Sequence, residues 1–153
     1  MRRDSRLSGV LHVLLHMAEA AGPITSEALA RALDTNPVVV RRIMGGLRDQ
    51  GYVSSEKGHG GGWTLSCELD QVTLRDVHEA LGSPQLFAIG NRCDDTQCLV
   101  EEAVNAAMSE ALAEAEERLL VRFGEITLTA LSADFHVRLA ERGGPVTLEE
   151  THV

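Results

Sequence analysis

Three arginines on one predicted helix are the side chains best suited to binding a nucleic acid. Arg41, Arg42 and Arg48 share one face of the segment 38–50 because residues about one helical turn apart fall together. A guanidinium can bind O6 and N7 of guanine with two hydrogen bonds, or it can hold a phosphate. That face carries no acidic residue, and the opposite face is apolar. The pattern favours insertion into the major groove of duplex DNA over a merely solvated helix face.

Side chains around this helix could complete a DNA-binding surface. Hydroxyl and amide groups that precede two predicted helices would contact backbone phosphates, and a short apolar pair would touch a thymine methyl group. Two basic side chains in a glycine-rich loop would lie on the minor groove or its phosphates. The expected phosphate contacts are Thr25, Ser26 and Asn36, and the expected contacts with a thymine methyl group are Pro37 and Val38. The basic loop residues are Lys57 and His59.

Cys93 and Cys98 are candidate redox-sensitive thiols. Cys98 is expected at the start of a long helix, where backbone N–H groups and the helix dipole favour a thiolate. Arg92 favours the thiolate as well, whereas Asp94 and Asp95 oppose it. Cys93 lies in the preceding loop and could reach Cys98 to form a disulfide. Three interpretations stay open: a redox switch, an unresponsive structural pair, and ligation of a metal or cluster.

Other motifs suggest chemistry that the sequence supports less well. His12 and His16 are four residues apart on a predicted helix, a spacing that metal ligands use, but exposed or interface histidines are favoured. Cys67 is expected to act as a small buried apolar side chain. The segment from His59 to Gly62 looks like an esterase oxyanion loop, yet the chain lacks a Gly-x-Ser-x-Gly nucleophile motif. It also lacks a Cys-x-x-Cys pair, so no enzyme is predicted.

The elements that position these residues follow from periodicity and turn signals. Apolar spacing predicts helices over 6–21, 26–33, 38–50, 73–82, 97–123 and 126–135, with strands over 51–55 and 63–65. Asn36 and Pro37 suit the cap and the first position of the third helix. Gly45 and Gly46 inside that helix each cost about 1 kcal/mol relative to alanine, which suggests a close contact.

The order helix, turn, helix and glycine-tipped hairpin predicts a mainly α fold with a small β-hairpin. We expect a winged helix-turn-helix DNA-binding domain over 1–82, a sensor loop over 83–97, a long dimerisation helix with a short following helix over 98–135, and a loosely ordered tail over 136–153. The long helix has an alanine-rich apolar stripe and a glutamate-rich opposite face. A two-fold dimer helix is favoured over an intramolecular core helix folded back on the first helix.

The bulk composition is compatible with this interpretation. The chain has 153 residues and a net charge of −9. Residues 1–66 hold eight basic and six acidic residues, a charge of +2, whereas residues 67–153 hold six basic and 17 acidic ones, a charge of −11. Phosphate contacts are therefore expected from the first half. No apolar run is long enough for a membrane span, no signal peptide is visible, and three cysteines argue against a disulfide framework. A cytoplasmic protein is expected.

Six segments in order resemble the Rrf2 family of bacterial winged-helix transcription regulators. The family includes repressors of iron–sulfur-cluster assembly, nitric-oxide responders and repressors of cysteine metabolism. The matching segments are Arg6-Leu7-Ser8; Thr25-Ser26-Glu27-x-Leu29-Ala30; Asn36-Pro37-Val38-Val39-Val40-Arg41-Arg42; Lys57-Gly58-x-Gly60-Gly61-Gly62-Trp63-x-Leu65; Val72-Thr73-Leu74-Arg75-Asp76-Val77; and Cys98-Leu99-Val100. The resemblance spans residues 6–131.

The resemblance implies a homodimer that binds a promoter palindrome and represses transcription. Relatives that carry an iron–sulfur cluster have three closely spaced cysteines before the long helix, whereas this chain has only Cys93 and Cys98 there. No cofactor is therefore the main expectation, and a cluster held by these cysteines and His12 of a partner subunit is the alternative. The rival function is a winged-helix protein–protein interaction module that does not bind DNA.

Overall fold

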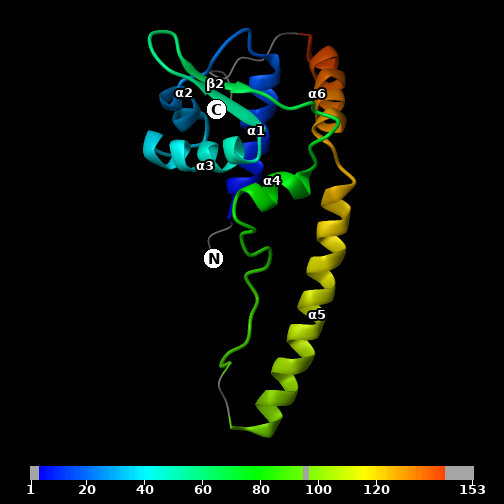
Figure 1. Cartoon of the computed structure of the whole chain (residues 1–153). Helices are drawn as coiled ribbons and strands as arrows, with labels where there is room; N and C mark the ends of the chain where they lie inside the picture. Colours follow the sequence, from blue (N-terminus) through cyan, green and yellow to red (C-terminus); the bar gives the residue numbers. More distant parts are fainter. Residues whose placement is uncertain (1–3, 95–96, 144–153) are drawn as a thin grey trace.

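The structure is a computed structural model, which describes residues 4–94 and 97–143 (Figure 1). Over these ranges it is mainly helical with one antiparallel hairpin, as the sequence predicts. The elements in chain order are α1 (Arg6–Glu19), α2 (Ser26–Ala32), α3 (Pro37–Asp49), β1 (Val53–Glu56), β2 (Gly62–Leu65), α4 (Leu74–Ala80), α5 (Leu99–Gly124) and α6 (Leu128–Arg142).

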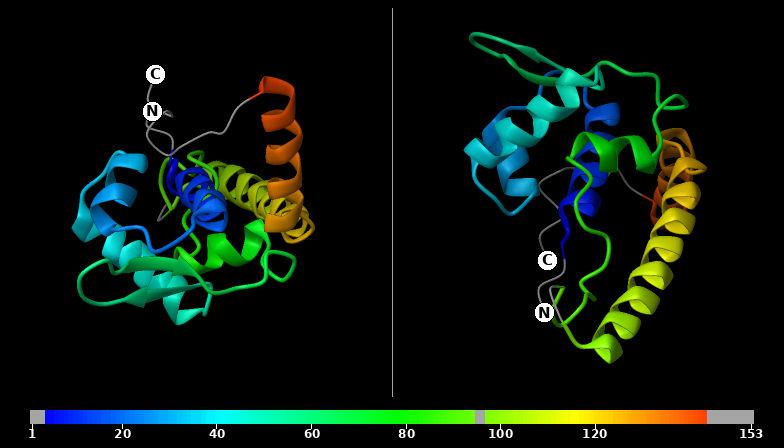
Figure 2. Two further views of the ribbon diagram at one scale, coloured as in Figure 1. Left: turned by 90° about the horizontal axis from the view of Figure 1, so that it is seen from above. Right: turned by 60° about the horizontal axis from the view of Figure 1, so that its bottom comes forward.

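Helix α1 is the centre of the core. It contacts α2, α4, α6 and β2, and Figure 2 shows these elements arranged around it. Its buried side chains Val10, Val13, Leu14 and Met17 recur at helical spacing, so a single apolar face meets several neighbours. The other elements complete this core with Leu29, Ala30, Val40, Met44, Leu47, Val53, Trp63, Val72, Val77 and Leu128.

Side-chain caps define the helix-turn-helix unit. The Thr25 hydroxyl accepts a hydrogen bond from the Ala28 N–H at 3.2 Å. The Asn36 side-chain oxygen accepts from the N–H groups of Val38 and Val39 at 3.0 and 3.1 Å. These bonds satisfy N–H groups that lack partners in the first turn of a helix. The caps therefore fix where α2 and α3 begin, and with them the face that α3 turns outward.

The hairpin is hydrogen-bonded to the segment that precedes α2. The strands pair from Val53 with Leu65 to Glu56 with Gly62. Trp63 also exchanges two backbone hydrogen bonds with Ile24, at 2.8 and 2.9 Å. Gly62 permits this approach: its φ is +156°, and a Cβ there would lie 2.6 Å from the Ile24 carbonyl oxygen. The wing base is thus part of the helix-turn-helix body.

Helix α5 projects from the body and meets the other described helices at its C-terminal end (Figures 1 and 2). Backbone hydrogen bonds join Leu74 to Ile126 at 3.0 Å and Leu128 to Val72 at 2.9 Å. None of its 26 residues is buried, and its main contact is with α4. The alternative of an intramolecular core helix folded back on α1 is therefore wrong for the chain as described.

The predicted end of the last helix is wrong. Helix α6 extends to Arg142 instead of ending at residue 135, and Gly143 terminates it with a left-handed φ of +74°. Residues 136–142, expected in a loose tail, are therefore helical. The rest of the expected tail, 144–153, lies outside the described residues. The loop over 83–97 contains no helix or strand in its described part.

Candidate nucleic-acid interface

The outward face of α3 presents the three predicted arginines to solvent. Arg41, Arg42 and Arg48 are exposed, and Val38 at the start of the helix is 63% exposed. On the opposite face Val40, Met44 and Leu47 are completely buried. The predicted division of the helix into a basic outer face and an apolar inner face is therefore confirmed. A helix anchored in this way can present its outer face to a groove without rearranging the core.

Two of the arginines contact carboxylates within the chain. The Arg41 guanidinium lies 3.3 Å from a carboxylate oxygen of Glu27 in α2, and Arg48 lies 3.7 Å from that of Asp49. Both pairs are more than half exposed, so each contributes little to stability. No ion pair of Arg42 is found within the part of the chain that the structure describes. A phosphate could therefore compete for these cations at small cost.

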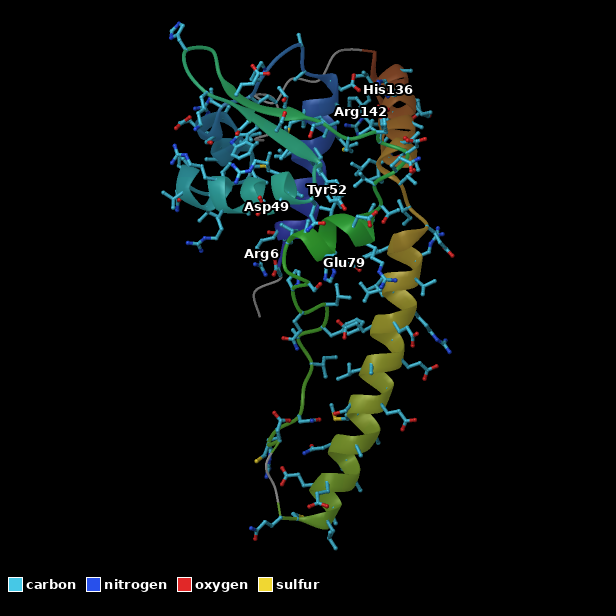
Figure 3. All side chains as sticks on the ribbon, in the orientation of Figure 1. Arg6, Asp49, Tyr52, Glu79, His136 and Arg142 are labelled. Carbon is cyan, nitrogen blue, oxygen red and sulfur yellow. The ribbon has the colours of Figure 1, made fainter. Side chains whose placement is uncertain are left out.

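Asp49 limits the basic surface at one end of α3. Figure 3 shows Asp49 and Tyr52 where α3 leads into β1, and the Tyr52 N–H bonds to the Leu47 carbonyl at 3.0 Å. Burial raises the pKa of the Tyr52 phenol, and the carboxylates of Asp76 and Glu79 raise it further. Asp49 therefore partly offsets the charge of Arg48 at this end of the helix, whereas Arg41 and Arg42 lie within its first two turns.

The three predicted phosphate contacts at the starts of α2 and α3 also have structural roles. Thr25 and Asn36 cap their helices through oxygen, which leaves the Thr25 hydroxyl proton and the Asn36 amide N–H groups available as donors. The Ser26 hydroxyl accepts a hydrogen bond from the Trp63 indole N–H at 3.0 Å. Sequence reasoning missed this link between β2 and α2, because no local pattern pairs residues 37 positions apart.

The wing tip carries the predicted basic loop residues. Lys57 and His59 are exposed between β1 and β2, where Gly58 and Gly60 have φ values of +99° and +76°. Those conformations suit glycine and close the hairpin tightly, as the sequence predicts. The loop extends outward beside α2 and α3 (Figure 2). Pro37, the remaining predicted contact, occupies the first turn of α3.

The two loop cysteines belong to the segment that leads into α5, at the opposite end of the molecule from the wing (Figure 1). Both are exposed thiols that form no disulfide, and Cys98 is the residue before α5. The Cys93 carbonyl accepts a hydrogen bond from the Asn105 side chain of α5 at 2.6 Å. Arg92, expected to favour the Cys98 thiolate, pairs with Glu101 of α5 at 3.4 Å. The loop is thus held against α5 around Cys93.

His12 and His16 lie apart from the cysteines within one chain. They line a groove of about 380 Å³ between α1 and α6, with Leu15, Phe135 and Leu139. Their ring centroids are 4.6 Å apart. Burial is the main cause that lowers the pKa of His16, and the nearby His12 lowers it further. Cys67 is half-buried against the core, and burial raises the pKa of its thiol.

The described residues of one chain do not fit a resident metal site. Among them, no three His, Cys, Asp or Glu side chains are grouped so that they could hold a metal ion. Cys93 and Cys98 supply two ligands at most, and His12 faces α6. Among the same residues, no helix has the length and apolar character needed to cross a bilayer.

The fold and this surface define a winged helix-turn-helix protein of the class that regulates transcription. The chain belongs to the Rrf2 family, whose sequence model, described as an iron-dependent transcriptional regulator, matches residues 3–134. A protein of Bacillus subtilis (strain 168) named as an HTH-type transcriptional regulator, YwgB, is 31% identical over 83 residues. That match covers 53% of this chain and 53% of YwgB, so the chain spans about half the length of this relative. The description of the family and the name of this relative are those of a transcriptional regulator and not of an enzyme.

Solved structures share the fold. A transcriptional regulator from Lactobacillus plantarum superposes with a TM-score of 0.70 at 23% identity, covering 88% of this chain and 91% of that one. CymR (YrzC), described as the global cysteine regulator of B. subtilis, superposes with a TM-score of 0.57 at 20% identity, covering 87% and 98%. At these identities the comparison shows the winged-helix architecture.

Proposed function

We propose that this regulator binds a specific duplex DNA site as a homodimer and represses transcription in response to thiol oxidation. The observation that carries DNA binding is the two-sided α3: Arg41, Arg42 and Arg48 face solvent, and the opposite side is completely buried. Lys57 and His59 are exposed at the tip of the hairpin, whose first strand contacts the same helix. This arrangement supplies one helix for the major groove and one loop for the neighbouring groove.

Helix α5 supports the homodimer. A 26-residue helix without a buried residue lacks the tertiary packing that stabilises most helices in proteins. Leu99, Val100 and Val104 on its first half are between half and four-fifths exposed, and alanines around them allow close approach of a second helix. Pairing with the α5 of a second copy would bury this surface. Two copies would then present two α3 helices to half-sites about 34 Å apart, or a multiple of that.

Cys93 and Cys98 support the redox response. Both thiols are exposed in the loop that leads into α5. Oxidation by a peroxide would join their sulfur atoms in a disulfide; the two thiols would lose two protons and two electrons, and the peroxide would be reduced to water or an alcohol and water. CymR, described as a global cysteine regulator, offers a parallel among proteins of this fold. A disulfide here would move the start of α5 and change the spacing of the two α3 helices.

Salt dependence of binding tests the DNA proposal. A gel-shift or fluorescence titration with a duplex from the promoter of the protein's own gene would be repeated between 50 and 200 mM salt. Replacing phosphate counterions makes affinity fall steeply over this range, with a log–log slope near −0.9 for each phosphate neutralised. The rival protein–protein module predicts no duplex binding, or binding without such a slope. Arg41→Ala should also make the slope shallower by about one.

The cysteine proposal is tested separately with diamide or peroxide. Wild-type protein should change its affinity for the duplex after oxidation and recover after reduction. Cys98→Ser should bind the duplex in the reduced state but lose the response. If Cys98→Ser still responds like the wild type, the switch involves another group.

A further inference from the structure

A buried histidine connects α4 to the start of the cysteine loop. The His78 side chain is 2% exposed, and its Nε2 lies 2.9 Å from the Pro84 carbonyl oxygen. A carbonyl oxygen can only accept a hydrogen bond, so Nε2 carries the proton and donates. Nδ1 has no hydrogen-bond partner among the described residues. The ring is therefore placed by packing and by this one bond.

The turn between α4 and the loop is held to the same residue. The Ser83 N–H bonds to the His78 carbonyl at 3.1 Å. Gly82 and Ser83 have φ values of +84° and +49°, and a left-handed conformation is unfavourable for serine. Side chain and backbone of His78 thus bind two consecutive residues, Ser83 and Pro84, and stabilise a turn that the sequence alone does not favour.

The end of α4 contacts α3 through a backbone carbonyl group. A Cβ on Gly46 of α3 would lie 2.8 Å from the Ala80 carbonyl oxygen of α4. No side chain separates the two helices at this point, so none can adjust its rotamer when α4 shifts. A small displacement of the end of α4 must therefore pass to α3 or open the contact. This contact also explains the glycine inside α3.

The cysteine loop is fixed at a second point. Asn105 of α5 donates to the Cys93 carbonyl at 2.6 Å, and Asn91 bonds to Ser109 of α5 at 3.3 Å. Between this attachment and Pro84 the loop has no helix or strand of its own. The chain segment between Pro84 and Cys93 is therefore hydrogen-bonded to a helix at each of its ends.

We infer that His78 is a positioning residue that couples the cysteine loop to α3, through its bond to Pro84 and the contact of Ala80 with Gly46. The inference rests on the proposed function, because it assigns a route by which loop chemistry would reach the DNA-binding helix. His78 touches neither DNA nor the thiols. His78 transmits a displacement of the loop to the end of α4, and the contact between Ala80 and Gly46 passes this displacement to α3.

The coupling can be measured without DNA or an oxidant. The full chain carrying Cys67→Ala would be alkylated at Cys93 and Cys98 with N-ethylmaleimide, and amide hydrogen exchange would be followed by mass spectrometry. Alkylation should speed exchange in the second half of α3 by about threefold or more, because local opening free energies report such contacts. His78→Leu, which keeps the volume but removes the donor, should abolish this response. His78→Gln, which keeps an N–H at similar reach, should retain it.

Each outcome decides the inference. Unchanged exchange in α3 after alkylation of the parent overturns it, as does a full response in His78→Leu. His78→Asn, whose amide is too short to reach Pro84, replaces the leucine variant should that one fail to fold. Failure of the proposed function looks different: the duplex titrations would show no salt-dependent binding or no thiol response, whatever the exchange data show.

Discussion

Neutralising Glu27 should strengthen DNA binding. Its carboxylate lies 3.3 Å from the Arg41 guanidinium in the free protein, so Arg41 must exchange this partner for a phosphate or a base. Glu27→Gln removes the competing charge and keeps the size and helix-forming tendency of the side chain. Arg41 is then available to DNA, and a negative charge beside the phosphate backbone is lost.

The expected gain follows from two terms. An exposed ion pair contributes about 0.2–1 kcal/mol, and Glu27 and Arg41 are both more than half exposed. A phosphate on Arg41 would lie about 6 Å from the Glu27 carboxylate, and two like charges at this separation in water repel by roughly 0.7 kcal/mol before salt screening. Salt at about 0.1 M screens the repulsion to roughly 0.4 kcal/mol. Together the two terms then give about 0.6–1.4 kcal/mol, an affinity gain of about three- to tenfold, since 1.4 kcal/mol is a factor of ten. The free energy of unfolding should fall by less than about 1 kcal/mol.

A duplex titration at fixed salt measures the effect. Glu114→Gln is the matched control: it removes the same charge from an exposed ion pair, with Arg118, on α5. Both variants change the net charge equally, so a general charge effect raises their affinities by the same factor. The reasoning is refuted if Glu27→Gln binds no more tightly than Glu114→Gln. In the Arg41→Ala background, Glu27→Gln should raise the affinity only by the part that comes from removing the repulsion between Glu27 and phosphate.

Three further predictions concern single side chains. Arg41→Ala should weaken specific binding by about 1–3 kcal/mol in a gel-shift titration, and unchanged affinity would remove Arg41 from the interface. Gly45→Ala should raise the free energy of unfolding in urea by up to about 1 kcal/mol, because its Cβ would meet open space, whereas Gly46→Ala should lower it by about 1–3 kcal/mol through the clash with Ala80. Burial lowers the pKa of His16, so the unfolded chain binds a proton more readily; stability should therefore fall as pH drops below about 6.5, and the melting temperature of His16→Gln should fall less.

Much of the fold could be predicted because its signals are local. The Asn36–Pro37 start and the buried face of α3 follow from capping and helical spacing, which depend on neighbours within a turn or two. The predicted end of α6 is wrong because the segment before the Gly143 terminator has no strong apolar stripe. The DNA contacts and the role of the cysteines stay predictions, although the outward position of the arginines is confirmed.

Contacts between distant segments could not be predicted in the same way. The bond of Trp63 to Ser26 and the approach of Gly46 to Ala80 join residues 37 and 34 positions apart. Gly46 did give a signal, since glycine inside a helix is unfavourable, but the sequence could not say which element approaches it. The sequence around His78 gives no such signal, because a histidine on a short helix is compatible with exposure. Only the packed structure shows that His78 is buried.

The exchange of backbone hydrogen bonds between Ile24 and Trp63 makes the wing a preorganised arm. Ordering a residue costs about 1–2 kcal/mol of backbone entropy, and a loop that becomes ordered on binding gives up that amount for each residue. Here β2 is bonded to Ile24 and β1 is paired with β2, so any loss of conformational freedom on binding is restricted to residues 57–61 at the tip. Small changes in tip composition should therefore alter affinity through direct contacts, with little change in the entropic cost of docking.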